Sequence, residues 1–143
     1  MKELREEIAQ YLFRSRGIVC SPERIIITSG STQGLSLIAN LQRNKNKKVI
    51  VENPSHPGLR NVIISAGCAI EAIRADNRGL DIDLLKPADD ISFFYTTPSH
   101  QYPLGGILPI QRRLSLIRYA EENNCYIVED DYDSEFRYEG QPL

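Results

Sequence analysis

Five short apolar runs, separated by helical patterns, constrain the fold of this 143-residue chain more than any other feature. The runs cover residues 25–28, 49–51, 69–73, 91–95 and 126–128. Between them apolar residues recur at helical spacing, as Leu35, Ile38 and Leu41 do. Regular alternation of strand and helix implies right-handed crossovers and a mainly parallel sheet with helices on both faces. The sequence therefore predicts an α/β fold of three layers.

The helical patterns place the other elements of this fold. We expect an amphipathic helix that starts near Leu4 and ends near Gly17. Further helices are expected around residues 35–41, 59–66 and 114–120, with a short one around residues 80–85. The chain contains no internal repeat and no interdomain linker. It is therefore expected to form part of one domain over residues 1–143.

Composition excludes several classes of function. The net charge of −2 gives no electrostatic reason for a nucleic-acid-binding or membrane surface. No apolar run reaches membrane-spanning length, and no signal-peptide core follows Met1. The three cysteines share no CxxC spacing and lie in or near apolar stretches, which is typical of reduced thiols. These features favour a cytoplasmic protein.

Acidic residues follow the last apolar run. Residues 125–128 are followed at once by Glu129, Asp130, Asp131 and Asp133. Ligands of open α/β sheets bind at the carboxyl ends of the strands. Because ionised carboxylates are costly to desolvate without a partner, this end of the chain is expected to meet a cation. A metal ion, an arginine and a protonated heterocycle all satisfy that expectation.

A second motif, residues 28–34, joins the first run to a helix. Gly30 permits a tight turn, and Ser29 or Ser31 can cap the helix. The free N–H groups of the first helical turn suit a phosphate. Taken alone, however, this segment is more typical of a capped helix start that binds no ligand.

Two loops complete the pattern. Residues 53–58 hold His56 between two prolines, and residues 96–106 carry many side-chain donors, including His100 and Tyr102. Each loop alone is compatible with an ordinary surface connection. All four motifs, however, follow the carboxyl ends of predicted strands. One ligand with a phosphate at one end and a cationic ring nitrogen at the other would use them all.

These four motifs, in this order, resemble a known family. Residues 26–33, 52–58, 97–105 and 129–138 are similar to the fold type I aminotransferase-like domain of MocR-type transcriptional regulators, a branch of the GntR family. The last two motifs are quite specific to that branch. The resemblance runs through essentially the whole chain, which represents less than half of the family's aminotransferase-like domain. It implies the large domain of a PLP-dependent transferase, in incomplete form.

The resemblance implies pyridoxal 5′-phosphate (PLP) as cofactor and assigns residues to it. Asp130 would pair with the protonated ring nitrogen, and Tyr132 would bind the ring hydroxyl. His56 takes the place of the residue that stacks on the ring, where the family often has tyrosine. Tyr102 stands where related aminotransferases carry an asparagine beside the ring hydroxyl. The phosphate would be held by Ser31, Thr32 and Gln33.

The resemblance also implies what this segment does not supply. The family's Schiff-base lysine lies in a Ser-Lys motif expected beyond residue 143, so we expect no transamination from residues 1–143 alone and assign no catalytic residue. The DNA-binding winged helix is expected before residue 1. The implied partners are an amino compound as effector or substrate and a second copy in a homodimer. DNA would be bound only through the other domain.

Two other functions explain part of the pattern. An ordinary aminotransferase of the same fold, acting on an aromatic or dicarboxylic amino acid, would share cofactor and site. A magnesium-dependent phosphotransfer domain would use Asp130, Asp131 and Asp133 as oxygen ligands. That last alternative gives the Ser31 turn and the His100 loop no joint role.

The resemblance finally predicts an incomplete sheet. In the family, the first strand pairs with strands from a part of the domain outside this segment. We therefore expect residues 25–28 to have unpaired backbone edges, with self-association or partial disorder as the result.

Overall fold

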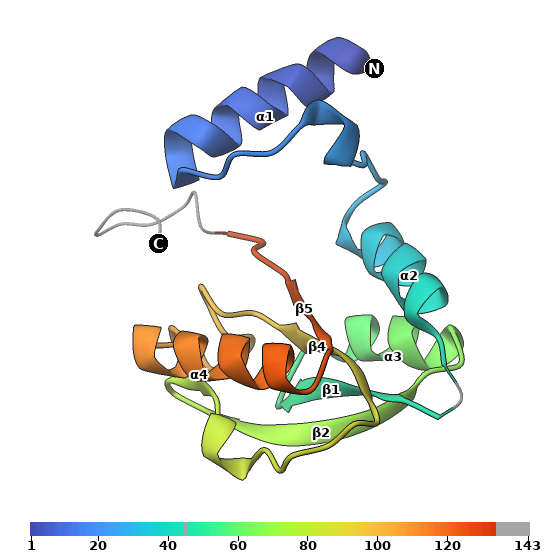
Figure 1. The fold of residues 1–143 in the computed structure, drawn as a ribbon, viewed down its shortest axis with the longest axis vertical. Helices are drawn as coiled ribbons and strands as arrows, with labels where there is room; N and C mark the ends of the chain where they lie inside the picture. Colours follow the sequence, from blue (N-terminus) through green and yellow to red (C-terminus); the bar gives the residue numbers. More distant parts are fainter. Residues whose placement is uncertain (45, 134–143) are drawn as a thin grey trace.

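A five-stranded sheet is the centre of the computed structural model, which describes residues 1–44 and 46–133 (Figure 1). The strands are β1 (Lys48–Asn53), β2 (Ala69–Asp76), β3 (Gly79–Leu80), β4 (Ile91–Thr96) and β5 (Tyr126–Glu129). Their spatial order is β3-β2-β1-β4-β5. All neighbours pair in parallel except β3, which is antiparallel to β2. The predicted α/β fold with a mainly parallel sheet is confirmed.

Helices cover both faces of this sheet. They are α2 (Ser31–Gln42), α3 (Pro57–Ser65) and α4 (Ile110–Glu122). A further helix, α1 (Lys2–Arg16), lies away from the sheet (Figure 1), and 3₁₀ turns occur at Pro22–Arg24 and Ile82–Leu84. On one face, Leu35 of α2 and Ile63 of α3 pack against β1 and β4. On the other face, Leu116 of α4 packs against β1 and β4 (Figure 1). The arrangement has the three predicted layers.

The interior strand β4 shows why the sequence folds this way. All of its residues are buried, because β1 and β5 flank it and helices cover both of its faces. From Phe93 on, successive side chains point to opposite faces, so Phe93 and Tyr95 join one core cluster and Phe94 joins the other. Ile91 also joins the second cluster, because the register against β1 shifts between Ile91 and Phe93. Burying each large apolar side chain contributes about 1.5–3 kcal/mol. The strand therefore provides a rigid base for the loop that follows it.

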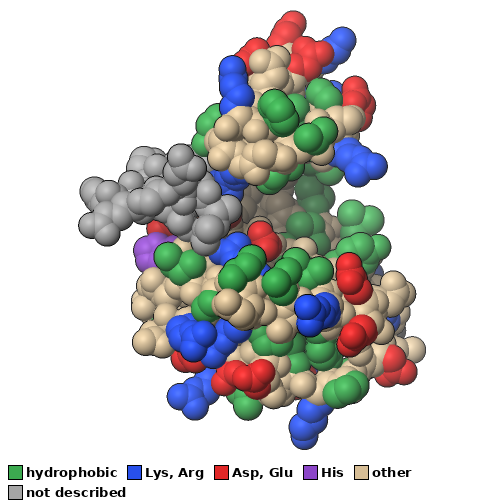
Figure 2. Space-filling model, turned by 60° about the vertical axis from the view of Figure 1, so that its left-hand side comes forward, with side chains coloured by type: hydrophobic (Ala, Val, Ile, Leu, Met, Phe, Trp, Pro, Cys, Tyr) green, Lys and Arg blue, Asp and Glu red, His purple; other side chains and the backbone are tan. Residues whose placement is uncertain are grey.

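Helix α1 ends where the sequence predicts. Gly17 adopts the left-handed conformation (φ 65°), and backbone N–H groups at this end donate to the carbonyls of Leu12 and Phe13. None of the α1 residues is buried. Figure 2 shows α1 at the top, separated by a hollow from the sheet and its helices, with acidic and basic side chains interspersed on the visible face. Among the described residues no helix is long and apolar enough to cross a membrane.

Two predicted elements differ from the structure. Residues 25–28 belong to no strand, because no neighbour within the described part of the chain pairs with them. Ile26 is accordingly 75% exposed. The predicted short helix around residues 80–85 is wrong at its start, where Gly79 (φ 79°) turns the chain back so that Leu80 pairs with β2. Only Ile82–Leu84 form a helical turn there.

Candidate functional site

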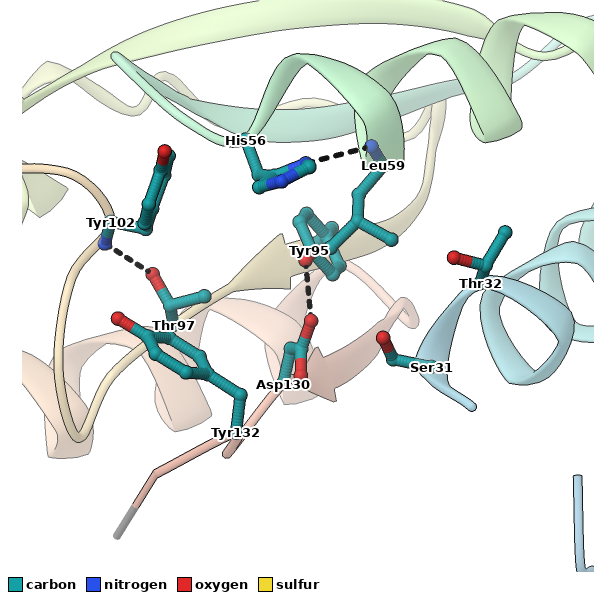
Figure 3. Close-up of a pocket in the computed structure, with 9 residues that line it drawn as sticks. All are labelled: Ser31, Thr32, His56, Leu59, Tyr95, Thr97, Tyr102, Asp130 and Tyr132. Carbon is teal, nitrogen blue, oxygen red and sulfur yellow. Dashed lines mark hydrogen bonds between the residues drawn. The ribbon is translucent and has the colours of Figure 1, made fainter. Parts of the chain in front are cut away.

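One cavity lies at the carboxyl end of the sheet and gathers most of the predicted site residues (Figure 3). Its volume is about 300 Å³, at the lower end of the range of small-molecule sites. It is lined by Ser31, Thr32, His56, Leu59, Tyr95, Thr97, Tyr102, Asp130 and Tyr132. Six of the seven residues predicted from the sequence are in this set; Gln33 is not. The start of α2 and the carboxylate after β5 therefore share one cavity.

The start of α2 forms one wall. Gly30 is the N-cap residue, and no side chain caps the helix, so the predicted capping by Ser29 or Ser31 is wrong. Instead, Gln33 Oε1 accepts a hydrogen bond from the N–H of Ser29 at 2.5 Å, which turns this side chain away from the cavity. Among the described residues, the hydroxyls of Ser31 and Thr32 have no hydrogen-bond partner. Both hydroxyls, and the first N–H groups of the helix, can therefore bind an anion.

The carboxylate of Asp130 forms another part of the cavity wall. The hydroxyl of Tyr95 donates to Asp130 Oδ2 at 2.7 Å, and the N–H of Asp130 donates to the carbonyl of Thr96 at 2.9 Å (Figure 3). These two bonds fix both the backbone and the carboxylate. Burial, together with the hydrogen bond to Asp130, raises the pKa of Tyr95 far above its ordinary value, so its hydroxyl stays a donor.

Tyr95 is a site residue that the sequence analysis missed. It is the last residue of the apolar run 91–95, and its ring lies in the core, 3% exposed. A buried tyrosine hydroxyl usually needs a hydrogen-bond partner, and this requirement was the available signal. The partner, Asp130, is distant in sequence.

Aromatic rings from two loops form a further wall. The rings of His56 and Tyr102 lie with centroids 5.2 Å apart and an interplanar angle of 48°. His56 is also the N-cap of α3, where its Nδ1 accepts from the N–H of Leu59 at 3.4 Å. A Cβ at Gly58 would lie 3.0 Å from His56 Cε1, so glycine leaves room for this ring. The N–H of Tyr102 donates to Thr97 Oγ1 at 3.2 Å.

Tyr132 approaches the cavity from the segment after β5 (Figure 3). Its hydroxyl donates to the carbonyl of His100 at 3.0 Å, and the two rings stack with centroids 5.8 Å apart. Nδ1 of the same histidine contacts the carboxylate of Asp133. Burial raises the pKa of Tyr132, and the carboxylates of Asp133 and Asp130 raise it further. Its ring is thereby held at the cavity with the hydroxyl protonated.

The geometry argues against the magnesium alternative. Asp130 accepts from Tyr95, Asp131 pairs with Arg16, and Asp133 contacts His100. Within residues 1–44 and 46–133, no group of three or more histidine, cysteine, aspartate or glutamate side chains could hold a metal ion. The three carboxylates therefore do not form the shared oxygen cluster that this alternative needs. The sequence also offers Arg137 as an internal partner for these acidic residues, and it lies outside the described residues.

A second cavity, of about 280 Å³, lies at the opposite, amino-terminal edge of the sheet. Lys48 is one of its lining residues, and its Nζ lies 2.8 Å from Glu71 Oε2 and 3.0 Å from Asp90 Oδ2. Lys86 also lines this cavity. No lysine of the described residues lines the cavity at the carboxyl edge.

The comparisons with known proteins agree with one another on the family. The sequence profile of "Aminotransferase class I and II" matches residues 1–141. The chain is 41% identical, over 98% of its length, to the HTH-type pyridoxine biosynthesis transcriptional regulator PdxR of Corynebacterium glutamicum. It is 35% identical, again over 98% of its length, to the probable rhizopine catabolism regulatory protein MocR of Rhizobium meliloti.

The chain spans only part of these relatives: 30% of the first and 28% of the second. Among solved structures, it is similar to LysN, the α-aminoadipate aminotransferase of Thermus thermophilus. That structure contains N-(5′-phosphopyridoxyl)-L-leucine. The TM-score is 0.86 at 29% identity, with 100% of this chain and 36% of LysN covered.

Proposed function

The chain belongs to the class I and II aminotransferase family, and we propose that residues 1–143 form the N-terminal portion of a domain that binds pyridoxal 5′-phosphate. One observation carries this proposal: groups that can bind an anion and a group that can bind a cation line the same cavity. Donors without partners lie at the start of α2, and a fixed carboxylate, Asp130, lines the same cavity. A ligand with an anionic group and a cationic ring nitrogen matches both ends.

The phosphate end would be held by Ser31 and Thr32. A phosphate monoester carries close to two negative charges near neutral pH, and it is favoured by the free N–H groups and the dipole of a helix start. Gln33 would contribute through its backbone N–H, because its side chain is bonded to Ser29. The hydroxyl and N–H donors of this wall therefore fit a phosphate.

The cationic end would be held by Asp130. Its carboxylate is oriented by Tyr95, and a pyridinium N–H would donate to it in a charge-assisted hydrogen bond. When bound, the cofactor supplies an electron sink for carbanion chemistry at an amino compound. Asp130 serves that chemistry by keeping the ring nitrogen protonated.

The ring itself would lie among aromatic side chains. His56 and Tyr102 contact each other at one side of the cavity, and Tyr132 lines it from the segment after β5. Their rings would exclude water from the faces of the cofactor and restrict its orientation. The Tyr132 hydroxyl, which donates to the His100 carbonyl, keeps its oxygen as an acceptor for a ring hydroxyl.

The finer role proposed for the parent protein is that of an effector domain in a MocR-type regulator. The support is the similarity to two proteins named as transcriptional regulators. In this proposal an amino compound is the effector, the protein is a cytoplasmic homodimer, and DNA is bound by a domain outside residues 1–143. The similarity to LysN supports a second candidate, an amino-acid aminotransferase with the same site. The reading frame on both sides of the codons for residues 1–143 separates them: a helix-turn-helix segment upstream supports the regulator.

Calorimetric titration of the chain with PLP and with pyridoxal tests the cofactor proposal. We expect saturable binding of PLP and weaker binding of pyridoxal, because pyridoxal has no phosphate for the α2 wall. Equal affinity for both compounds would contradict the assignment of that wall. Failure of PLP to bind would contradict the proposed function of this chain.

A further inference from the structure

A buried carboxylate lies behind the proposed site and was not singled out from the sequence. Glu52, near the end of β1, is 1% exposed. Within the described part of the chain it pairs with no cation. Its partners are all neutral donors: the hydroxyl of Thr96 at 2.5 Å, the hydroxyl and N–H of Thr97 at 2.8 and 3.3 Å, and Nε2 of Gln101 at 3.3 Å. Burial of a charge without a counterion is costly, so these contacts require an explanation.

We infer that Glu52 is a positioning residue of the cofactor site, fixing Thr97 and Gln101 and, through them, the aromatic wall formed by Tyr102 and His56. This inference rests on the proposed function. It goes beyond that function because it assigns the wall's geometry to a residue that does not line the cavity.

The direction of the hydrogen bonds requires an acceptor at Glu52. The N–H of Tyr102 donates to Thr97 Oγ1, so the hydroxyl proton of Thr97 is available for Glu52 Oε2. The same carboxylate oxygen accepts from the N–H of Thr97. It also lies 3.3 Å from Gln101 Nε2, where it shares one of two hydrogens that point mainly at the carbonyls of Pro54 and Tyr102. An ionised carboxylate, which only accepts, satisfies all of these donors.

Gln101 links this hydrogen-bond network to the loop after β4. It is fully buried, and its Nε2 lies 2.8 Å from the carbonyl of Pro54 and 2.8 Å from the carbonyl of Tyr102. Its Oε1 accepts from the N–H of Leu104 at 3.1 Å. One side chain therefore joins the segment after β1 to the loop after β4. Glu52 lies at their junction.

The consequence for the cavity is geometric. His56 is two residues after Pro54, and Tyr102 directly follows Gln101, so each ring is attached to a backbone that this network holds. The rings lie 5.2 Å apart only if both segments keep their relative position. The negative charge of Glu52 also contributes, after burial and the charge of Asp130, to raising the pKa of Tyr95.

The test compares Glu52→Leu with Glu52→Gln. Glutamine can keep its carbonyl oxygen on the Thr97 side while the Thr96 hydroxyl rotates to accept, whereas leucine leaves buried donors unsatisfied. We expect Glu52→Leu to weaken PLP binding by about tenfold or more and to abolish the nuclear Overhauser effect between the His56 and Tyr102 rings. We expect Glu52→Gln to keep the ring contact and to bind PLP within about threefold of wild type.

A matched control removes a buried hydrogen bond at the other end of β4. Ser92 donates to the carbonyl of Gln42 at 2.9 Å and is distant from the cavity, so Ser92→Ala should lower stability without changing PLP affinity or the ring contact. If Glu52→Leu does not fold, Gln101→Met decides instead, with the same expected loss of the ring contact.

Each outcome is informative. Wild-type PLP binding and an intact ring contact in Glu52→Leu would overturn the inference, and so would equal losses in the Gln and Leu variants. If the wild-type chain does not bind PLP, the proposed function fails, but the ring contact still decides whether Glu52 positions this wall.

Discussion

The two edges of the sheet carry cavities of nearly equal size but opposite chemical character. At the carboxyl edge, the donors of Ser31 and Thr32 have no partner among the described residues, and Asp130 is held by a neutral hydroxyl. At the amino edge, Lys48 is already neutralised by Glu71 and Asp90. The volumes, about 300 and 280 Å³, do not distinguish the two. The difference lies in which polar groups are still available to a ligand.

This comparison teaches how to locate a binding site in such a chain. Charged groups that are paired within the protein contribute to its stability, whereas polar groups without a protein counterion are available to bind a ligand. The carboxyl edge is therefore assigned to the cofactor, in agreement with the rule that open α/β sheets bind ligands at this edge. Substitutions at the two ends of the sheet test this division.

The largest effect is expected from Asp130→Asn. An amide cannot replace the negative charge opposite a cationic ring nitrogen, and a hydrogen bond to a charged group contributes about 1.5–3 kcal/mol. PLP affinity measured by calorimetry should therefore fall by about 10- to 100-fold. Lys48→Met, at the other edge, is the control and should bind PLP as wild type does. Equal losses in both variants would refute the division.

A smaller effect is expected when the α2 wall loses its hydroxyls. The double variant Ser31→Ala, Thr32→Val removes two neutral donors, each worth about 0.5–1.5 kcal/mol. PLP affinity should drop by about tenfold while pyridoxal affinity stays unchanged, because pyridoxal has no phosphate. A parallel loss for pyridoxal would show that these residues do not contact the phosphate.

A paired charge away from either cavity should act on stability alone. The guanidinium of Arg112 lies 2.9 Å from both carboxylate oxygens of Asp76 and, together with the N–H of Arg78, lowers the pKa of Asp76 from 3.8 to about 2. Because this pair is partly exposed, we expect Asp76→Asn to reduce the free energy of unfolding at pH 7 by about 1 kcal/mol.

The pH dependence of that loss has a definite sign. The folded state favours ionised Asp76, so the stabilisation is complete above pH 3.8 and disappears as pH falls through about 2. Urea denaturation of wild type and variant between pH 7 and pH 2 should give curves that converge at the acidic end. A difference that persists at pH 2 would mean that the ion pair is not its source.

The smallest effect is expected from Lys48→Met. Contact with Glu71, and then with Asp90, raises the pKa of Lys48, but the three side chains are partly exposed. We expect a loss of less than about 1 kcal/mol in the free energy of unfolding, measured by urea denaturation, and a smaller loss in high salt. A loss that does not change with salt would point to packing of the lysine stem instead.

The sequence predicted most of the fold because most elements follow from local pattern. Residues 91–95 and 25–28 are both apolar runs, yet only the first became a strand, β4, buried between β1 and β5. Residues 25–28 have no partner strand among the described residues, so the apolar pattern alone predicted a strand that does not form. Strand pairing depends on distant segments, and no local signal reports whether a partner is present.

The same distinction explains the site. Ser31, His56, Tyr102 and Asp130 were found because each follows a predicted strand, and parallel strands end at one edge. Tyr95 and Glu52 were missed because their roles arise only from partners far away in the sequence, Asp130 and Gln101. In the sequence, only the presence of a polar group within an apolar strand indicated such a role.

The central claim is tested most directly by mapping backbone amide chemical-shift changes in an isotope-labelled sample of the chain during titration with PLP. The account predicts the largest changes at Ser31, Thr32 and Asp130, and none at Lys48 or Lys86. Changes concentrated at the amino edge of the sheet, or at only one of the two walls of the carboxyl-edge cavity, would contradict it.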